Sequence, residues 1–346
     1  MESRAQFRFS FGPWNIHEGA DVFGPPVRKP VPFAEKLAVY KRLGFDGVQF
    51  HDDDVVASVD VPHEQLVKEA QAVRKLLDNE GLVAEFVAPR LWEHPLTIDG
   101  GYTANDPQAR AYARERSKKA IDIANILGTK LIVLWPAREG IYVNESKDHR
   151  RNIERLVEAI NEMLDYDKEI KILGEMKPNE PMDHAYVPTT GHFLAVSYTT
   201  NDPDRVGTLI ESAHAILAGL DPAIEMGFAL YHDKLWSVHL NDQNGLKFDE
   251  DRIFGAINLK RAFDQVLVLY ENDYGANGEF VGLDVKALRT QKAEVATQHL
   301  AHSRQIFLDL LEVVKGLDRT SLEAYRTSRN YEELEYFIIK HLMGTS

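Results

Sequence analysis

The chain has 346 residues and contains no cysteine. A disulfide framework and a thiolate metal site are therefore both excluded, and any metal ion must be held by His, Asp or Glu side chains. An excess of basic residues is also missing, because 54 acidic residues face 40 basic ones and the formal net charge is −14. Nucleic-acid binders obtain much of their affinity from basic groups that contact phosphates, so this balance argues against that class.

Long apolar runs are absent as well. No run approaches the ~20 residues of a membrane span, and residues 1–12 (MESRAQFRFSFG) lack the apolar region of a signal peptide. The hydrophobic fraction of 44% and the charged fraction of 27% are ordinary for a folded globular protein. We therefore expect a cytoplasmic enzyme or binding protein that has neither a membrane nor a nucleic acid as its partner.

Apolar segments alternate with amphipathic ones along the chain. Eight segments have the composition of buried strands, at about 7–12, 46–51, 82–89, 130–136, 170–177, 205–211, 235–241 and 279–285. Longer segments between them are helical in pattern, for example 33–43, 62–80 and 107–127. Gly44 and Gly128 follow two of these segments, at the position where helices commonly end on glycine.

Strands that are apolar throughout and alternate with helices indicate a parallel sheet covered on its faces. Eight such units predict a (β/α)₈ TIM barrel, an α/β fold, over residues 1–316. The rival is a doubly wound sheet, but the first strand is followed by FSFGPWNIHEG and not by the glycine-rich phosphate loop of that fold. Residues 317–346 are expected to form a short C-terminal helical tail that contacts another subunit.

Side chains with metal-binding capacity gather where the predicted strands end. In a TIM barrel the carboxyl ends of the strands carry the active site. Four consecutive strands deliver a candidate ligand there, and the loop after the seventh strand adds two aspartates. The candidates are Glu175, Glu211, His214, His239, Asp249, Asp251 and Asp284.

Each candidate also has a structural explanation when it is taken alone. A strand-end carboxylate often caps the next helix, and Glu211 with His214 has the spacing of a helix-surface pair. The runs 52–54 and 249–251 resemble solvated acidic turns, while His239 in an apolar strand resembles a core histidine. The joint pattern favours a metal centre, because carboxylates gathered at one barrel mouth would repel one another without a cation.

The ligand types narrow the choice of metal. Oxygen-rich sites with a few imidazoles suit Mg²⁺, Mn²⁺ or Co²⁺, and zinc remains an option. Seven candidates are too many for one ion beside a substrate, so two divalent ions that share a carboxylate are the natural arrangement. The five carboxylates, with a charge of −5, would nearly balance the +4 of two such ions.

At these positions the chain resembles the xylose isomerase family. The matching strings occur in the family's order and extend over about residues 7–315. They are VQFHDDD (48–54), LWEHP with DGGYTAND (91–106), LWPAREG (134–140), EMKPNEP (175–181), ExxH (211–214), HLNDQNGLKFDEDRIFG (239–255) and DVK (284–286).

The resemblance implies a role for each candidate residue. It assigns the first ion to Glu175, Glu211, His239 and Asp284, and the second to Glu211, His214, Asp249 and Asp251. It assigns sugar-ring opening to His51 and Asp54, and contact with the substrate near its reacting carbons to Lys177. It assigns the walls of the sugar site to Trp14, Trp92 and Trp135, entry into the neighbouring subunit's site to Phe23, and a cis peptide bond to Glu180–Pro181.

The implied activity is the interconversion of an aldose and its 2-ketose by a hydride shift between C1 and C2, with D-xylose as the first substrate to test. It implies two divalent ions, no organic cofactor and a homodimer or homotetramer. Alternatives are the isomerisation of another aldose (L-rhamnose-type or hexose), a ketose 3-epimerase, and a sugar-binding relative without activity. A metal-dependent nuclease of the same barrel type is disfavoured by the negative charge and the tryptophans.

The sequence departs from the family pattern in three ways. His239 stands where an aspartate ligand is usual, which predicts a preference for Mn²⁺ or Co²⁺ over Mg²⁺. Ala88, Pro89 and Arg90 replace the sugar-facing Thr-Thr-Asn, so the identity of the sugar is open. The tail after residue 315 is also shorter than the family's subunit-embracing arm, which makes a dimer more secure than a tetramer.

Overall fold

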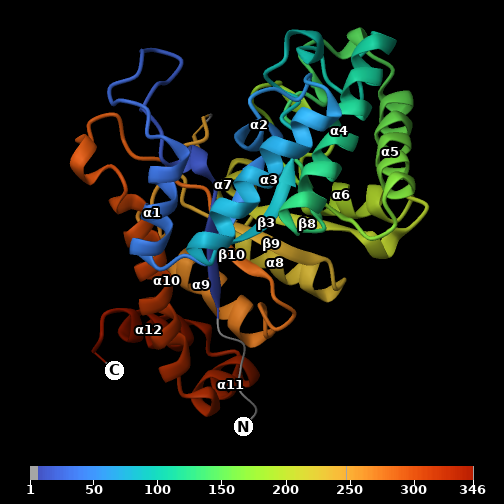
Figure 1. The fold of residues 1–346 in the computed structure, drawn as a ribbon. Coiled ribbons are helices and arrows are strands. Elements are labelled where there is room, and N and C mark those ends of the chain that lie inside the picture. The colour runs from blue at the N-terminus through green and yellow to red at the C-terminus, as the bar shows by residue number, and fades with distance from the viewer. Residues whose placement is uncertain (1–6, 247, 346) are drawn as a thin grey trace.

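Eight parallel strands close into a barrel in the computed structural model, which describes residues 7–246 and 248–345 (Figure 1). Neighbours around the barrel follow the order of the chain, and the first strand pairs with the last. This confirms the predicted (β/α)₈ fold. The strands are β1 (Arg8–Phe11), β2 (Gly47–His51), β3 (Val83–Ala88), β4 (Leu131–Leu134), β6 (Lys171–Glu175), β8 (Val206–Glu211), β9 (Leu235–Leu240) and β10 (Phe280–Leu283).

Helices alternate with the strands and surround them (Figure 1). They are α1 (Phe33–Leu43), α2 (Asp52–Val55), α3 (His63–Glu80), α4 (Pro107–Leu127), α5 (His149–Tyr166), α6 (Thr190–Ser197), α7 (Ser212–Leu217), α8 (Pro222–Tyr231), α9 (Leu259–Glu271) and α10 (Gln298–Gly316). A small antiparallel pair, β5 (Gly140–Ile141) with β7 (His184–Ala185), joins two loops at the barrel mouth. Short 3₁₀ turns lie at Pro13–Asn15, Pro95–Thr97, Asn144–Ser146, Pro203–Arg205 and Ala293–Val295.

Each predicted strand range contains one barrel strand, and the helices predicted at 33–43 and 107–127 have the observed ends. Both helices stop where predicted because Gly44 and Gly128 adopt left-handed backbone angles, with φ of 73° and 84°. That conformation is open to glycine without steric cost and ends the helical hydrogen-bond ladder.

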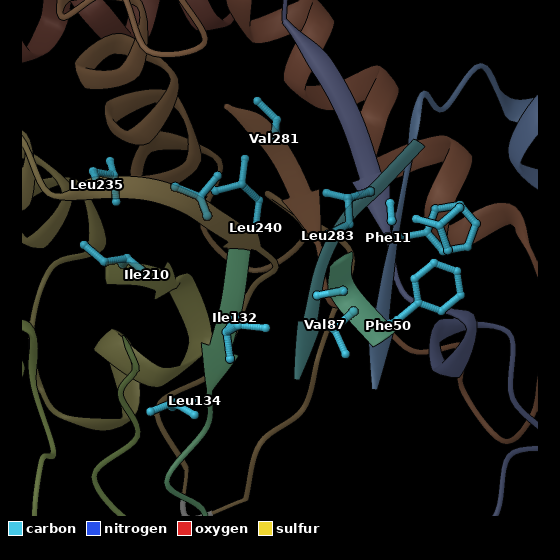
Figure 2. Packing of buried hydrophobic residues seen from close by; sticks show 14 of the residues in the cluster. Phe11, Phe50, Val87, Ile132, Leu134, Ile210, Leu235, Leu240, Val281 and Leu283 are labelled. Atoms are coloured by element: carbon cyan, nitrogen blue, oxygen red, sulfur yellow. The ribbon is translucent and has the colours of Figure 1, made fainter. Parts of the chain in front are cut away.

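The main hydrophobic core lies between the strands and the helices (Figure 2). Phe11 of β1 stacks on Tyr40 of α1 with ring centroids 3.7 Å apart, and full burial of such a side chain contributes about 1.5–3 kcal/mol. Alternate residues of the strands, among them Val133 and Leu173, form a second cluster that fills the barrel interior. The barrel is therefore packed below its mouth, which leaves the loops at the carboxyl ends of the strands to build the site.

The predicted tail is present as α11 (Arg319–Ser328) and α12 (Tyr331–Leu342). Leu322 and Ile338 are buried against the chain's own barrel, beside α9 and α10. The tail lies at the end of the barrel where the chain enters β1 (Figure 1). Its contact with another subunit stays a prediction. Within the described part of the chain, no helix combines the length and hydropathy needed to cross a membrane.

Candidate metal centre and sugar site

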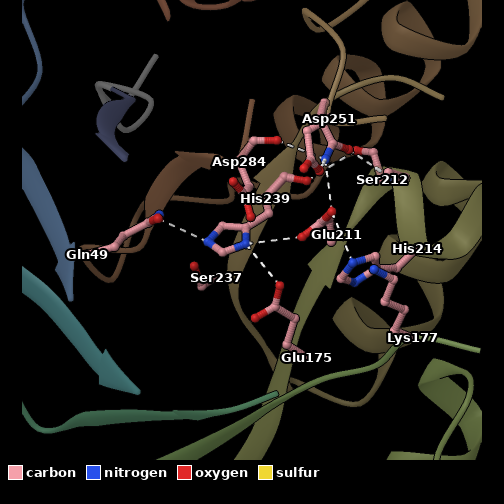
Figure 3. Close-up of polar contacts among 12 residues, drawn as sticks. Gln49, Glu175, Lys177, Glu211, Ser212, His214, Ser237, His239, Asp251 and Asp284 are labelled. Atoms are coloured by element: carbon pink, nitrogen blue, oxygen red, sulfur yellow. Dashed lines mark hydrogen bonds and ion pairs between the residues drawn. The ribbon is translucent and has the colours of Figure 1, made fainter. Parts of the chain in front are cut away.

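Four of the predicted ligands converge at the carboxyl ends of four barrel strands. Glu175 ends β6, Glu211 ends β8, His239 lies in β9 and Asp284 directly follows β10. Each offers one ligand atom, and these atoms all lie within 4.8 Å of one another. His239 Nδ1 lies 3.2 Å from Glu175 Oε1 and 3.4 Å from Glu211 Oε2 (Figure 3). We call these four residues the first ligand group.

Glu211, His214 and Asp249 form a second ligand group, whose ligand atoms also lie within 4.8 Å of one another. His214 is the third residue of α7, and its Nε2 lies 3.2 Å from Glu211 Oε1 and 3.0 Å from Asp249 Oδ2. Glu211 therefore belongs to both groups. A carboxylate shared in this way could hold two ions.

Asp251, the seventh predicted ligand, lies beside the second group and not within it. Its carboxylate pairs with the ammonium of Lys286 and accepts a hydrogen bond from the Asn241 amide. Burial and the neighbouring Asp249 raise the pKa of Asp251 well above its usual range. Lys247, in the string that carries both aspartates, lies outside the described residues.

The ionisable side chains of the first ligand group have pKa values shifted in different directions. Burial raises the pKa of Glu211 well above its usual range. Burial also opposes ionisation of Glu175, but the neighbouring His239 outweighs it and lowers the pKa of Glu175 to about 2. In turn Glu175 raises the pKa of His239 well above 6.5, although burial alone would lower it. Acids and imidazoles thus share protons where no other cation neutralises them.

A buried carboxylate oxygen without a partner indicates that the centre suits a cation. Asp249 Oδ1 is buried and accepts no hydrogen bond from any described residue, and Glu211 Oε2, also buried, has no such hydrogen bond but lies 3.4 Å from His239 Nδ1. A buried carboxylate oxygen without a partner is costly unless a positive charge faces it. The donor set of carboxylate oxygens and imidazole nitrogens is one that Mg²⁺, Mn²⁺, Co²⁺ and Zn²⁺ accept.

Lys177 lies at the edge of the second ligand group, with its side chain 7% exposed. Its Nζ is 2.9 Å from Glu180 Oε2 and 3.0 Å from Asp249 Oδ2. Burial would lower the pKa of Lys177, but these carboxylates outweigh it and raise the pKa above its ordinary value. Lys177 is therefore a fixed ammonium that can donate to a substrate oxygen, and it is not a base.

Three tryptophans lie near His51 and the ligand groups, and their role as walls of a sugar site stays a prediction of the resemblance. The ring of Trp14 lies 4.2 Å from the ring of His51, and Trp92 lies 5.2 Å from His51 on another side. Trp92 and Trp135 meet edge to face at 4.5 Å, and the Lys177 ammonium lies 5.4 Å from the Trp135 ring. Trp92 and Trp135 thus contact each other directly, and His51 lies between Trp92 and Trp14.

Comparison with known proteins identifies the family. The profile described as xylose isomerase-like TIM barrel matches residues 37–270. The xylose isomerase of Thermus thermophilus is 37% identical over 303 residues, which are 85% of this chain and 76% of that protein. The chain belongs to the xylose isomerase family. The xylose isomerase of Thermus caldophilus is 36% identical over the same shares of both chains.

Solved structures show the same barrel in more distant proteins. A D-tagatose 3-epimerase-like protein superposes with a TM-score of 0.62 at 18% identity, over 89% of this chain and 98% of the other. The 3-keto-D-glucoside 4-epimerase of E. coli gives 0.64 at 14% identity, over 87% and 100%. At these identities the likeness concerns the fold alone. Membership of the xylose isomerase family makes the chain a sugar-isomerase-type enzyme.

In this xylose isomerase relative, Trp14 also donates a hydrogen bond to one of the predicted metal ligands. Its indole Nε1 donates to Asp284 Oδ1 at 3.0 Å, and the Asn15 amide donates to the same oxygen at 2.7 Å. Both donors come from the turn after β1, so this loop fixes the orientation of a predicted ligand from β10. Sequence reasoning missed Asn15. The only signal for it was its place beside Trp14 at the end of a strand.

His51 and Asp54, predicted to open the sugar ring, form a pair with His51 Nδ1 3.0 Å from Asp54 Oδ2. Arg90, which sequence analysis noted only as a departure from the family, reaches the same nitrogen with its Nη2 at 2.6 Å. Because a guanidinium only donates and a carboxylate only accepts, Nδ1 serves one of the two partners at a time. Arg90 thus competes with Asp54 for His51 Nδ1.

The interpretation of 52–54 as a solvated acidic turn is wrong for Asp52. Asp52 is fully buried, and Arg116 of α4 binds it with two hydrogen bonds of 2.7 Å. This pair anchors α2, which carries Asp54. No local pattern in the sequence indicates the pair, because the partners are 64 residues apart.

Two further expectations concern the loops. The Glu180–Pro181 bond is cis, as the resemblance implied. Phe23 lies in an exposed turn after β1, with 87% of its surface accessible. An aromatic side chain so exposed is available to a neighbouring subunit, and its entry into that subunit's site stays a prediction.

Proposed function

We propose that the protein is a metal-dependent aldose–ketose isomerase, with D-xylose and D-xylulose as the first pair to test. The observation that carries the proposal is the pair of ligand groups that share Glu211, with Lys177 at their edge. Divalent ions held there would polarise the hydroxyl and carbonyl oxygens of an open-chain sugar. The family membership supports the same activity.

The side chains around the ligand groups have complementary tasks. His51 with Asp54 can exchange a proton with the ring or anomeric oxygen of a cyclic sugar. The Lys177 ammonium donates to the oxygen at C1 or C2 and stabilises negative charge on it. Trp14, Trp92 and Trp135 exclude water beside the reacting carbons, which strengthens these electrostatic contacts.

A panel of pentoses, hexoses and 6-deoxyhexoses, each with Mg²⁺, Mn²⁺ or Co²⁺, tests the proposal by the appearance of ketose. We expect ketose from D-xylose, with more activity in Mn²⁺ or Co²⁺ than in Mg²⁺ because His239 replaces a carboxylate. Full activity with Mg²⁺ and no gain from the other ions would contradict the metal preference. Ketose from none of the aldoses would leave a ketose 3-epimerase or a sugar-binding role.

Isotope labelling distinguishes the isomerase from a ketose 3-epimerase. A hydride shift carries deuterium from C2 of the aldose to C1 of the ketose without exchange. Epimerisation by proton transfer at C3 takes deuterium from heavy water and needs no aldose. Retained label at C1 therefore supports the proposal, and solvent deuterium at C3 of a ketose supports the epimerase.

A further inference from the structure

A chain of buried polar side chains runs beneath His239, inside the barrel. Gln49 of β2 contacts the imidazole, with its Oε1 3.1 Å from His239 Nε2 (Figure 3). Gln49 Nε2 lies 3.2 Å from Glu85 Oε2 and 3.1 Å from Ser10 Oγ. Gln49 and Ser10 are fully buried, and Glu85 is 2% exposed. Sequence analysis assigned no role to these residues.

The direction of each hydrogen bond follows from Glu85. Its carboxylate is surrounded by donors, namely the hydroxyls of Ser10 and Ser237 and the Gln49 amide. Because a carboxylate accepts and does not donate, Gln49 turns its NH₂ group toward Glu85 and its carbonyl oxygen toward His239. A carbonyl oxygen also only accepts, so His239 keeps its proton on Nε2. The remaining nitrogen, Nδ1, is the one that faces Glu175 and Glu211.

We propose that Gln49 and Glu85 are positioning residues that hold the proton of His239 on Nε2 and so leave Nδ1 free to bind a metal ion. The proposal rests on the metal-dependent function proposed above. An imidazole that ligates through one nitrogen needs its proton on the other, and the partner of that proton fixes the ring orientation. An aspartate at this position would need no such device, because both its oxygens are ligand atoms.

The backbone makes room for this chain at two places. In the pairing of β2 with β3, the register shifts between Val48 and Phe50, so that Glu85 and Phe86 together face Gln49. Such an irregularity re-aims a side chain. In β10, Gly282 pairs with His239, and a Cβ on Gly282 would lie only 2.4 Å from Gln49 Nε2. The Gln49 amide therefore occupies space that exists because residue 282 is glycine.

Metal titration of chelator-treated protein tests the proposal without relying on activity. All variants carry Asp249→Asn, so that the first ligand group is measured alone by Mn²⁺ calorimetry. Gln49→Met keeps the length of the side chain but removes its hydrogen bonds, and we expect it to weaken Mn²⁺ binding about 10–100-fold. Ser237→Ala removes a donor to Glu85 but leaves Gln49 in place, and its affinity should stay within about threefold of the parent.

A swap variant provides the rescue. In Gln49→Glu with Glu85→Gln, the new carboxylate at residue 49 accepts from both the amide introduced at residue 85 and His239 Nε2, so the proton stays on Nε2. We expect its Mn²⁺ affinity to return to within about threefold of the parent. A purely structural role predicts another result, in which Ser237→Ala weakens binding as much as Gln49→Met and the swap restores nothing. Parental affinity in folded Gln49→Met would also overturn the proposal.

The parent protein offers a test that needs no substitution in the chain of hydrogen bonds. In zinc-loaded protein with ¹⁵N-labelled histidine, the His239 ring proton should be found on Nε2, with the signal assigned by its loss in His239→Gln. A proton on Nδ1 would overturn the proposal. A parent that binds no divalent ion would refute the metal-dependent function itself, whereas normal binding that ignores Gln49 would refute only the positioning role.

Discussion

The buried ion pair between Asp52 and Arg116 supports the segment that carries His51 and Asp54. The Asp52 side chain is 0% exposed and that of Arg116 is 6% exposed. Arg116 Nε and Nη2 each lie 2.7 Å from one carboxylate oxygen, and the backbone amides of Arg90 and Asp53 donate to the same carboxylate. Replacing Arg116 with methionine would leave this carboxylate buried with its cation removed.

The expected cost of Arg116→Met is about 3–5 kcal/mol of unfolding free energy, the range for breaking a buried pair on one side. Arg114 provides a matched control on the same helix. Its pair with Glu162 spans 3.4 Å, and the two side chains are 34% and 45% exposed. Such a surface pair contributes about 0–1 kcal/mol, so Arg114→Met should change stability little. Adding Asp52→Asn to Arg116→Met removes the stranded charge and should recover part of the loss.

Urea denaturation of the three variants and the parent, at one fixed metal concentration, measures these differences. Amide hydrogen exchange of residues 52–55 then shows whether α2 opens first, as expected if the pair anchors that helix. Equal stabilities of Arg116→Met and Arg114→Met would refute the reasoning. So would a further loss, in place of a gain, when Asp52→Asn is added.

Three more predictions concern the site itself. Lys177→Met should lower kcat about 10²–10³-fold while Mn²⁺ binding persists, because it removes one donor to the developing charge; an unchanged kcat would exclude that role. Without metal, the raised pKa values of His214 and His239 stabilise the fold below about pH 6.5, the pKa of an unfolded histidine, and this stability is lost as pH rises through the folded-state pKa values. The Tm of chelated protein should therefore fall on going to alkaline pH, and saturating Mn²⁺ should remove the trend. Phe23→Ala should raise KM and leave the Tm unchanged, since the ring is exposed in a single chain; an unchanged KM would contradict its entry into a neighbouring site.

Local pattern and parallel topology explain how much the sequence could predict. Apolar runs and glycine stops indicated the barrel strands and the ends of α1 and α4. The strands of a closed parallel barrel have their carboxyl ends at the same mouth, so the sequence alone could place Glu175, Glu211 and His239 together there. Those predictions needed only the order of the elements.

Contacts that depend on register or on distant helices could not be predicted in this way. Glu85 reaches Gln49 because the pairing of β2 with β3 shifts its register. No residue pattern in β3 indicates such a shift. Arg116 lies within an amphipathic helix, where an arginine is normally solvated. Only the packing of α4 over α2 turns it inward, toward Asp52.

The two lysines beside the ligand groups, Lys177 and Lys286, differ in how far their side chains are exposed to solvent. Lys177 is 7% exposed, and its ion pairs with Glu180 and Asp249 hold its ammonium in place. Lys286 has 47% of its side chain exposed and pairs with Asp251. A long exposed side chain can turn into solvent at little cost, since its charge remains hydrated. If Lys286 turned into solvent, Asp251 would become available to a metal ion, which is the ligand role that the sequence predicts for it.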